Sequence, residues 1–433
     1  MRSRTPKSTE PLVQIRTVRS VTRRGLIEAG GGAAAAAIVS PPALAQEGDN
    51  LPPSVPEWQL HPGDEVLSLP YGRPSKFEAN VVRRYRQGSP EPPTRLSSFS
   101  LTPLQDLCGI ITPNGLHYER HHAGVPTIDP LEHRLIVHGL VERPLVFAME
   151  DLTRFPSSSR VHFLECSGNT QNWAAPKPEL TAQDTHGLLS CCEWTGVPLA
   201  TVLAEAGVKP EAKWMLAEGA DAAAMTRSIP IEKALDDALL AYAQNGERLR
   251  PEQGYPLRLL LPGYEGNTSV KWLRRLKLGT EPFQTREETS KYTQLMPDGV
   301  ASQFNFVMEA KSVITFPSGG QKLTALGFYE VSGLAWSGAG KVARVEVSVD
   351  GGRSWRDAAL QQPVMSKCLT RFRFPWRWDG GQATLASRVT DETGYVQPTR
   401  EALMKVRDAR SYYHYNAIQN WSVAADGAVT NAG

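Results

Sequence analysis

The sequence predicts two folded domains, a mixed α/β domain followed by a β-sandwich. Short apolar strands and amphipathic helical segments alternate between about residues 98 and 300. From about residue 301 onward, short strands with Gly-rich turns follow one another at regular spacing. The chain has 433 residues, of which 41% are hydrophobic, so it can bury both cores and is not a largely disordered protein.

Four segments of the first domain carry clear secondary-structure signals. Residues 135–139 and 257–261 are apolar runs that end in turn residues, which predicts a strand in each. The apolar residues of segment 197–206 fall on one helical face, and this predicts a short helix. We predict a second helix over residues 231–243.

The second domain contains the alternating pattern of a half-buried strand. Between residues 345 and 349 valine alternates with polar residues, and an Asp-Gly-Gly turn at 350–352 follows. This pattern predicts a strand that enters a hairpin. Further strands are expected at 371–374 and 383–389, and together these short strands predict a β-sandwich of about 100 residues.

The N-terminus has the features of an export signal. A Thr-Arg-Arg-Gly-Leu-Ile segment at 22–27 precedes a weakly apolar run of about 11 residues, and an Ala-Leu-Ala site ends at residue 45. That run is shorter than the roughly 20 residues that span a bilayer, so we expect no membrane span in the mature protein. We predict a twin-arginine signal over residues 1–45 and a periplasmic location; an ordinary secretory signal is the main alternative. Residues 46–97, rich in Pro and polar residues, are expected to form an extended arm.

Charge and cysteine content exclude two broad classes of protein. The chain has 47 Lys and Arg against 45 Asp and Glu, and seven of the basic residues lie in the predicted signal. A nearly neutral mature protein is not expected to bind nucleic acid. Five cysteines are too few for a disulfide scaffold.

Cys166 is the strongest single candidate for chemistry. It ends an apolar strand and enters a polar, Gly-containing turn in the segment Phe-Leu-Glu-Cys-Ser-Gly-Asn-Thr at 163–170. A thiolate at that point would be accessible, and the thiolate is the form that attacks substrates or binds metals. The alternative on these residues alone is a buried structural cysteine.

Two further clusters could bind an anionic ligand. The segment 118–126 contains Arg120, His121 and His122, and adjacent histidines on an extended chain point to opposite faces. The segment 256–273 is rich in glycine and contains Arg258 and Lys271, which could clamp an anion. Taken alone, Lys271 is more typical of a solvated surface charge.

Together these motifs resemble the sulfite oxidase family of molybdenum enzymes. The order is R-x-H, then C-x-G-N, then P-x-R…G…V-K-W-L, followed in the sandwich by W-S-G-x-G and V-S-x-D-G-G-x-S-W. The resemblance spans roughly residues 100–420. It implies a molybdopterin-binding catalytic domain over 98–300 and an immunoglobulin-like dimerisation domain with a C-terminal tail over 301–433. It also implies molybdenum with one molybdopterin as the cofactor, and we expect no haem because the chain has no C-x-x-C-H motif.

The resemblance assigns roles to individual residues. Cys166 corresponds to the thiolate ligand of molybdenum, and a soft thiolate suits such a metal. The residues that correspond to binders of the pterin and its phosphate are His122, Arg258 and Lys271. The corresponding catalytic positions are the substrate-side arginine Arg120, the active-site tyrosine Tyr292 and an acidic residue near the pterin, Asp221.

The departures from the family pattern concern the substrate. Family members that oxidise sulfite carry two more arginines, at the positions that we match to Gln171 and Asn420, and an aromatic residue where this chain has Asp184. A sulfite dianion in a dry pocket needs compensating positive charge. We therefore predict a substrate with less negative charge at the reacting end, with Gln171, Asp184 and Asn420 as substrate-site candidates.

The resemblance is closest to family members that oxidise sulfane sulfur on a carrier-protein cysteine, as in thiosulfate oxidation. It implies a c-type cytochrome as electron acceptor, a sulfur-carrier protein as partner, and a homodimer or heterotetramer. One alternative keeps the family and makes the chain a sulfite dehydrogenase or another molybdopterin oxidoreductase. Another is a secreted binding protein in which Cys166 is structural.

Overall fold

The computed structural model describes residues 74–85, 94–170, 177–408 and 411–433. The predicted signal and most of the predicted arm lie outside the described residues, as does Gln171. Of the arm, Lys76–Glu78 forms a single 3-10 turn, and Arg84 pairs with Leu101 through a β-bridge. Within the described part of the chain, no helix is long and apolar enough to cross a membrane.

The first sheet of the α/β domain has five strands in the order β4-β3-β12-β7-β8. β12 lies at its centre and pairs in parallel with β3 and antiparallel with β7. The strands are β3 (Arg134–Gly139), β4 (Leu145–Ala148), β7 (Trp214–Gly219), β8 (Thr226–Pro230) and β12 (Leu273–Gly279). The strand predicted at 135–139 is thus confirmed, as part of a mixed sheet.

The second sheet has the order β10-β9-β6-β5, and β11 also pairs with β9. Its strands are β5 (Ser158–Glu165), β6 (Leu189–Pro198), β9 (Leu239–Gln244), β10 (Glu247–Arg248) and β11 (Arg258–Leu260). β11 confirms the strand predicted at 257–261. Cys166 follows β5 directly, so this sheet sets its place.

Short helices connect these strands. They are α2 (Met149–Thr153), α3 (Ala182–His186), α4 (Leu199–Ala206), α5 (Ile231–Asp236) and α6 (Arg286–Thr289). α4 confirms the helix predicted over 197–206 and begins after Pro198. The helix predicted over 231–243 is wrong in its second half, because α5 ends at Asp236 and residues 239–244 form β9. That segment pairs with β6 on one side and with β10 and β11 on the other.

The C-terminal domain is a sandwich of two sheets, β15-β16-β20-β19 and β18-β17-β21-β22-β23. One sheet contains β15 (Lys311–Phe316), β16 (Gly327–Trp336), β19 (Ala359–Leu360) and β20 (Thr370–Trp378). The other contains β17 (Val342–Ser348), β18 (Arg356–Asp357), β21 (Ala383–Asp391), β22 (Asn420–Val423) and β23 (Val429–Asn431). The predicted hairpin is the β17–β18 pair. An Asp-Gly-Gly turn at 379–381 joins β20 to β21, and these two strands lie in different sheets, so the chain crosses from one sheet to the other there.

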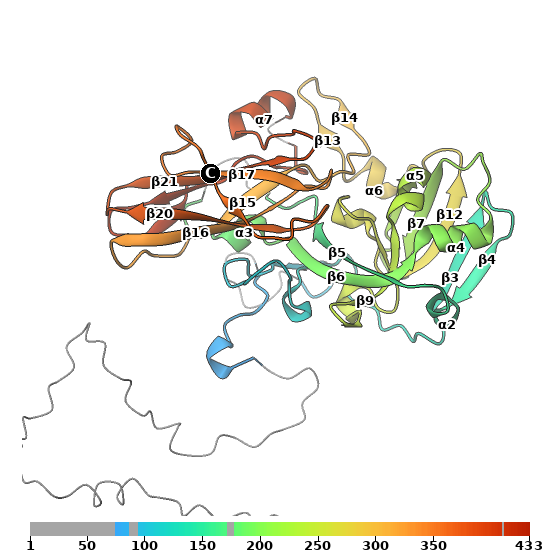
Figure 1. Cartoon of the computed structure of the whole chain (residues 1–433). Helices are drawn as coiled ribbons and strands as arrows, with labels where there is room; N and C mark the ends of the chain where they lie inside the picture. Colours follow the sequence, from blue (N-terminus) through green and yellow to red (C-terminus); the bar gives the residue numbers. More distant parts are fainter. Residues whose placement is uncertain (1–73, 86–93, 171–176, 409–410) are drawn as a thin grey trace, which may run out of the picture. The chain divides into compact units, whose positions relative to one another are not determined.

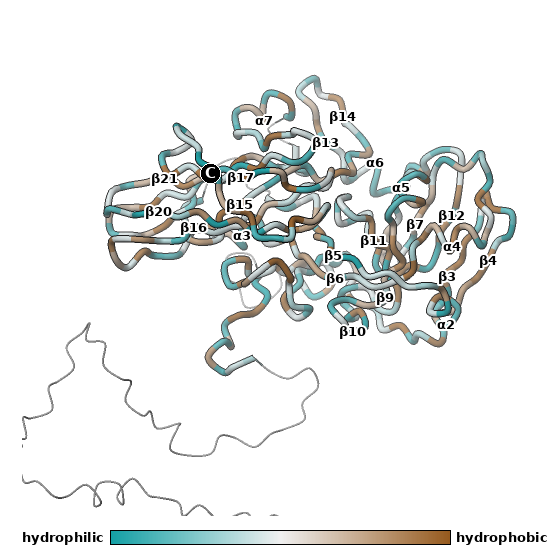
Figure 2. Tube along the Cα trace, in the orientation of Figure 1, coloured by the Kyte–Doolittle hydropathy of each residue, from teal (hydrophilic) through white to brown (hydrophobic). Residues whose placement is uncertain are grey.

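Small elements complete the described chain. They are the pair β1 (Phe99–Ser100) and β2 (Glu119–Arg120), the pair β13 (Gln294–Leu295) and β14 (Ala301–Ser302), the helix α7 (Arg400–Val406), and 3-10 turns at Asn114–Leu116, Pro251–Gln253 and Gly266–Thr268. Figure 1 shows α4 and α5 beside the strands of the first sheet, and β16, β20 and β21 gathered in the sandwich. Figure 2 shows apolar residues along the packed strands and hydrophilic residues in many of the connecting loops.

The two domains meet through close backbone contact. Gly263, after β11, has a φ of +79°, and a Cβ there would lie 2.3 Å from the carbonyl oxygen of Gly338, after β16. Met308 bridges the two glycines: its N–H donates to the carbonyl of Gly263 and its carbonyl accepts from the N–H of Gly338. This junction explains why the Trp-Ser-Gly-Ala-Gly motif at 336–340 needs glycine at 338.

Candidate active site

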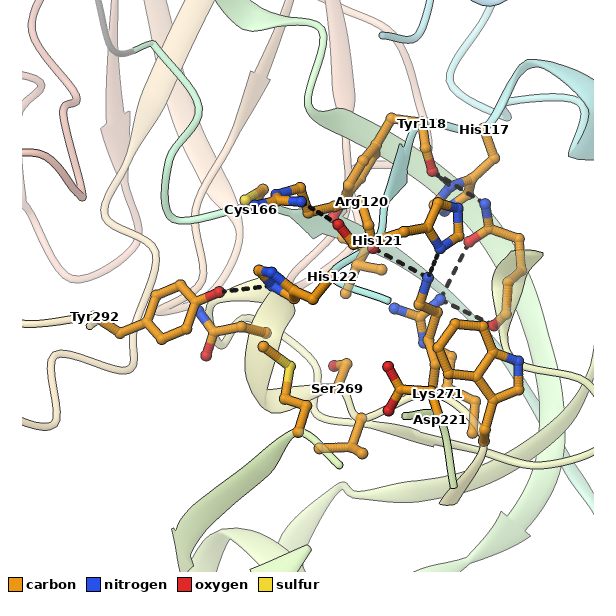
Figure 3. A pocket seen from close by; sticks show the side chains of 18 residues that line it. His117, Tyr118, Arg120, His121, His122, Cys166, Asp221, Ser269, Lys271 and Tyr292 are labelled. Atoms are coloured by element: carbon orange, nitrogen blue, oxygen red, sulfur yellow. Dashed lines mark hydrogen bonds between the residues drawn. The ribbon is translucent and has the colours of Figure 1, made fainter. Parts of the chain in front are cut away.

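Seven predicted site residues line one inner pocket of the α/β domain (Figure 3). They come from five separate segments, which β2, β5, β7, β11 and the loop after α6 bring together. They are Arg120, His122, Cys166, Asp221, Arg258, Lys271 and Tyr292. A set of residues spread over about 170 positions of sequence thus forms one site.

Cys166 occupies a fixed turn at the end of β5. Its N–H donates to the carbonyl of Leu188 (3.0 Å), and its carbonyl accepts from the N–H of Asn169 (2.9 Å). The side chain is partly exposed, toward the pocket that it lines. Burial raises the pKa of the Cys166 thiol, so a bound cation is needed to hold it as a thiolate.

Three cations face the pocket without a carboxylate partner. Arg258 donates from Nη1 to the backbone and side-chain oxygens of Gln253, each at 3.2 Å. Lys271 Nζ donates to the carbonyls of Arg120 (3.1 Å) and Glu252 (3.0 Å). Among the described residues, no carboxylate oxygen lies within 4 Å of the charged nitrogens of Arg120, Arg258 or Lys271.

The pKa values of two of these cations reflect their burial. Burial lowers the pKa of Arg258 to about 10. Burial and the nearby Arg258 lower the pKa of Lys271 well below its ordinary value. Both shifts come from the loss of solvent around a cation, which a bound anion would reverse. The pocket is therefore suited to a ligand that carries negative charge.

The adjacent histidines contact different groups. His121 Nε2 lies 2.7 Å from a carboxylate oxygen of Glu119, and its Nδ1 lies 3.0 Å from Lys271 Nζ. Burial and Lys271 lower the pKa of His121 to about 3, so the ring is neutral, donates from Nε2 and accepts at Nδ1. His122 instead contacts Tyr292. Burial and Arg120 lower the pKa of His122 to about 4.

Tyr292 lies where the pocket opens outward. Its hydroxyl is 3.3 Å from His122 Nε2, and its backbone adopts a φ of +41°. Burial raises the pKa of Tyr292, with the nearby Cys166 and Tyr413 adding to the shift. A neutral phenol next to a neutral imidazole donates its proton to that ring, so Tyr292 presents a hydrogen-bonding group to the pocket.

Asp221 supplies the carboxylate of the site. It follows β7, and its charge opposes the lowering of the Lys271 pKa. Figure 3 shows Asp221 beside Lys271, whereas Tyr292 and Cys166 lie toward the other side of the view. The pocket thus has a carboxylate at one end and a thiol with a phenol at the other.

A larger outer chamber of about 780 Å³ adjoins the inner pocket. Both are lined by Arg120, His122, Cys166, Met225 and Tyr292. The chamber is further lined by Arg286, Lys291, Tyr412 and Tyr413, among others. Cys166 therefore lies at the boundary between the two spaces.

Two predicted substrate-site residues have other partners among the described residues. Asp184 lines neither space; its carboxylate caps α3 and accepts from the N–H and the hydroxyl of Thr181, at 3.0 and 2.5 Å. Asn420 is the first residue of β22, and its amide donates to the carbonyl of Gly433 (2.6 Å). The linear spacing could not show that a helix cap and the sandwich sheet hold these side chains. Gln171 lies outside the described residues.

The sequence reasoning missed two histidine roles in the pocket. His117 donates from Nδ1 to the carbonyl of Tyr118 (2.7 Å), and burial lowers its pKa to about 3. Its Nε2 is a buried acceptor without a partner in the described part of the chain. His121 is the second. Their place in the same histidine-rich segment as His122 was the available signal.

The donor set fits a molybdenum–molybdopterin group. A partly exposed thiol is a soft metal ligand. Cations without carboxylate partners suit a phosphate. Buried polar atoms without partners, His117 Nε2 and Arg258 Nε, can bond to a polar ring system.

Comparison with known proteins agrees with this reading. Residues 122–287 match the family model described as the oxidoreductase molybdopterin binding domain, and residues 302–421 match the Mo-co oxidoreductase dimerisation domain. Mitochondrial sulfite oxidase of Mus musculus is 33% identical over 326 residues, which cover 71% of this chain and 58% of the relative. NADH nitrate reductase of Solanum lycopersicum is 32% identical over 340 residues, or 67% of this chain and 36% of the relative. The chain thus spans little more than half the length of these sulfite oxidases and less of the nitrate reductases.

A solved structure covers more of the chain. The crystal structure of the sulfane dehydrogenase SoxCD from Paracoccus pantotrophus matches with a TM-score of 0.84 and 48% sequence identity. The match covers 88% of this chain and 97% of that one. Together with the two domain matches, this shows that the chain belongs to the sulfite oxidase family of molybdopterin oxidoreductases.

Proposed function

We propose that this chain is the molybdenum subunit of a sulfane dehydrogenase that oxidises sulfane sulfur on a carrier-protein cysteine. The observation that carries the proposal is the 48% identity to the sulfane dehydrogenase SoxCD over almost all of that chain. The outer chamber supports it, because about 780 Å³ beside Cys166 can admit a substrate borne on a polypeptide.

Each residue of the inner pocket has a distinct task in this proposal. Cys166 would bind the metal, whereas Arg258, Lys271 and His122 would hold the pterin and its phosphate. Asp221, which lines the same pocket, would accept hydrogen bonds from polar groups of the pterin. When bound, the molybdenum group supplies the two-electron oxidation of the substrate sulfur, with an oxygen atom that derives from water.

The substrate-side residues orient the reacting group and handle protons. Arg120 reaches both the pocket and the chamber, so its guanidinium can bind an anionic part of the substrate. Tyr292 holds a proton at its hydroxyl oxygen, in hydrogen-bond contact with the bare nitrogen of His122. The pair can therefore move a proton between the chamber and the imidazole.

We further propose that the mature protein works in the periplasm after twin-arginine export and passes its electrons to a c-type cytochrome subunit. The Arg-Arg motif at residues 23–24 supports the export route. The SoxCD likeness and the dimerisation-domain match support a homodimer or a heterotetramer with the cytochrome. The export route is tested by replacing both arginines with lysine and locating the protein by cell fractionation.

Steady-state turnover with two substrates tests the proposed activity. The molybdenum-loaded protein is assayed by reduction of a c-type cytochrome, with either sulfite or a short peptide that carries a cysteine persulfide. We expect kcat/KM to be at least 100-fold higher for the peptide persulfide. A preference for sulfite instead would make the chain a sulfite dehydrogenase, the alternative that the sulfite oxidase relatives favour.

A further inference from the structure

Glu165, the residue before Cys166, is a fully buried carboxylate that the proposed reaction does not use. Its side chain has 0% exposure, and both oxygens are engaged. Lys311 Nζ donates to Oε1 at 2.7 Å, and Trp336 Nε1 donates to Oε2 at 2.7 Å. Lys311 is itself only 1% exposed, so this ion pair is shielded from solvent and held in one geometry.

Both donors come from the sandwich domain. Lys311 is the first residue of β15 and Trp336 is the last residue of β16, and the two are directly paired in the sheet. The carboxylate that precedes Cys166 therefore accepts hydrogen bonds from a single cross-strand pair at the end of that sheet. The contact spans the junction between the two domains.

A third donor ties this carboxylate to the Cys166 turn. Asn169 Nδ2 donates to Glu165 Oε1 (2.9 Å) and to the carbonyl of His186 (3.0 Å). Its Oδ1 accepts from the N–H of Leu188 (3.1 Å), and its own N–H donates to the carbonyl of Cys166 (2.9 Å). Hydrogen bonds from Asn169 to Glu165 and to the carbonyl of Cys166 thus fix the turn from Glu165 to Asn169.

None of these partners lines the inner pocket or the outer chamber; Glu165, Asn169, Lys311 and Trp336 all lie behind Cys166. They cannot touch substrate or cofactor from there, but they determine where the thiol lies. We propose that Lys311 and Trp336 of the sandwich position the Cys166 thiol through Glu165. The sandwich domain then sets the geometry of the active site, which is a role beyond self-association. This inference rests on the proposed role of Cys166 as the metal ligand.

The chain offers a matched control. Lys367 of the sandwich also forms an ion pair across the domain junction, with Asp237 at 2.6 Å, but it lines neither space and does not contact the Cys166 turn. Lys367→Met therefore removes a junction ion pair without disturbing Glu165. Any effect of Lys311→Met that Lys367→Met lacks belongs to the Cys166 turn.

The first readout is the reaction of Cys166 with iodoacetamide in cofactor-free protein. A Cys108→Ser background removes the exposed Cys108, and the other three cysteines are buried. Peptide mass mapping follows alkylation of Cys166 at one fixed pH. We expect Lys311→Met to change that rate at least fivefold, because the turn is no longer held, and Lys367→Met to leave it within twofold.

The second readout is the Mo(V) electron paramagnetic resonance signal of loaded protein, together with kcat. Loss of a residue that orients a metal ligand typically costs 10–100-fold in activity or metal affinity. We expect Lys311→Met to shift the signal and lower kcat by about that factor, and Lys367→Met to do neither. If Lys311→Met does not fold, Trp336→Phe removes one donor, keeps most of the ring packing, and carries the same two measurements.

The proposal is overturned if the alkylation rate and the spectrum of the folded variant match those of the wild type. The ion pair would then stabilise the fold without positioning the thiol. Cys166→Ser separates this failure from failure of the proposed function. If Cys166→Ser keeps its molybdenum and its turnover, Cys166 is not the metal ligand, whatever the alkylation rates show.

Discussion

At the scale of residues, the pocket combines uncompensated positive charge with neutral histidines. In the described part of the chain, Arg258 and Lys271 have carbonyl, imidazole and aromatic-ring partners but no carboxylate partner, so their charge is available to an anion. His121 and His122 have low pKa values because burial and nearby cations disfavour protonation. At neutral pH the cations can therefore bind an anion, while the neutral imidazoles can accept hydrogen bonds.

Tyr292→Phe removes the hydroxyl and leaves the ring contacts in place. We expect kcat to fall about 100-fold with little change in KM, since positioned proton donors contribute at least that much. The control is Tyr329→Phe, which removes a phenol that bonds to the backbone of Ala325 in the sandwich. Equal kcat values for Tyr292→Phe and the wild type would exclude the proton-transfer role.

Lys271→Met removes the ammonium group proposed to bind the cofactor phosphate. A hydrogen bond to a charged group is worth about 1.5–3 kcal/mol, so we expect molybdopterin to bind about 10–100-fold more weakly. Metal and pterin content after extended dialysis measures this loss. Exposed Lys341→Met is the control, and full cofactor retention in Lys271→Met would contradict the assignment.

At the scale of elements, the glycine contact between β11 and β16 makes a strong prediction. Ala at 263 would place its Cβ 2.3 Å from the Gly338 oxygen and would also need a φ of +79°. Gly394→Ala has a similar φ of +86° but open space around the Cβ, so it pays only the conformational cost of about 1–2 kcal/mol. We expect Gly263→Ala to lower the free energy of unfolding by at least about 2 kcal/mol more. Similar melting temperatures for the two variants would show that the junction can relax.

Some of these elements could be predicted from the sequence, and others could not. α4, β3, β11 and the β17–β18 hairpin follow local periodicity and turn chemistry, so the sequence predicted them. The sequence did not predict β9, because Leu239–Gln244 forms a strand through its pairing with β6, β10 and β11 rather than through a local signal. Local spacing also gave no sign of the partners of Asp184 and Asn420, which are Thr181 and Gly433.

At the scale of the whole molecule, polar contacts join the catalytic domain to the sandwich. Glu165 forms an ion pair with Lys311. Asp237, which follows α5, forms ion pairs with Lys367 and with Lys233 of α5. The sequence motifs predicted both domains, but no spacing in the sequence indicated which residues pair across the junction between them. Contacts between residues more than 100 positions apart had to come from the structure.

The Asp237 contacts predict a pH dependence of stability. Burial raises the pKa of Asp237, but the hydrogen bonds and charges of Lys233 and Lys367 lower it by a larger amount. The pKa of Asp237 in the folded protein therefore lies below its ordinary value of 3.8. The stabilisation is therefore complete above about pH 5 and is lost as the pH falls through the folded-state pKa. We expect Asp237→Asn to cost about 2 kcal/mol near pH 7, somewhat less than a fully buried pair would.

Urea unfolding of the cofactor-free protein between pH 3 and pH 7 measures this difference. The difference in the free energy of unfolding between wild type and Asp237→Asn should be constant from pH 7 to about pH 5. It should narrow as the pH falls from there through the unfolded-state pKa of 3.8 toward the folded-state pKa. A gap that stays constant down to pH 3 would show that the carboxylate is not titrating in that range.

Rapid mixing tests most directly whether the Cys166 pocket oxidises sulfane sulfur rather than sulfite, as we propose. Oxidised protein with one molybdenum per chain is mixed with sulfite or with a peptide persulfide, and the absorbance of the metal centre is followed. We predict fast bleaching by the peptide persulfide, while sulfite at the same concentration leaves the centre oxidised. Fast bleaching at low sulfite, with no response to the persulfide, would contradict the account.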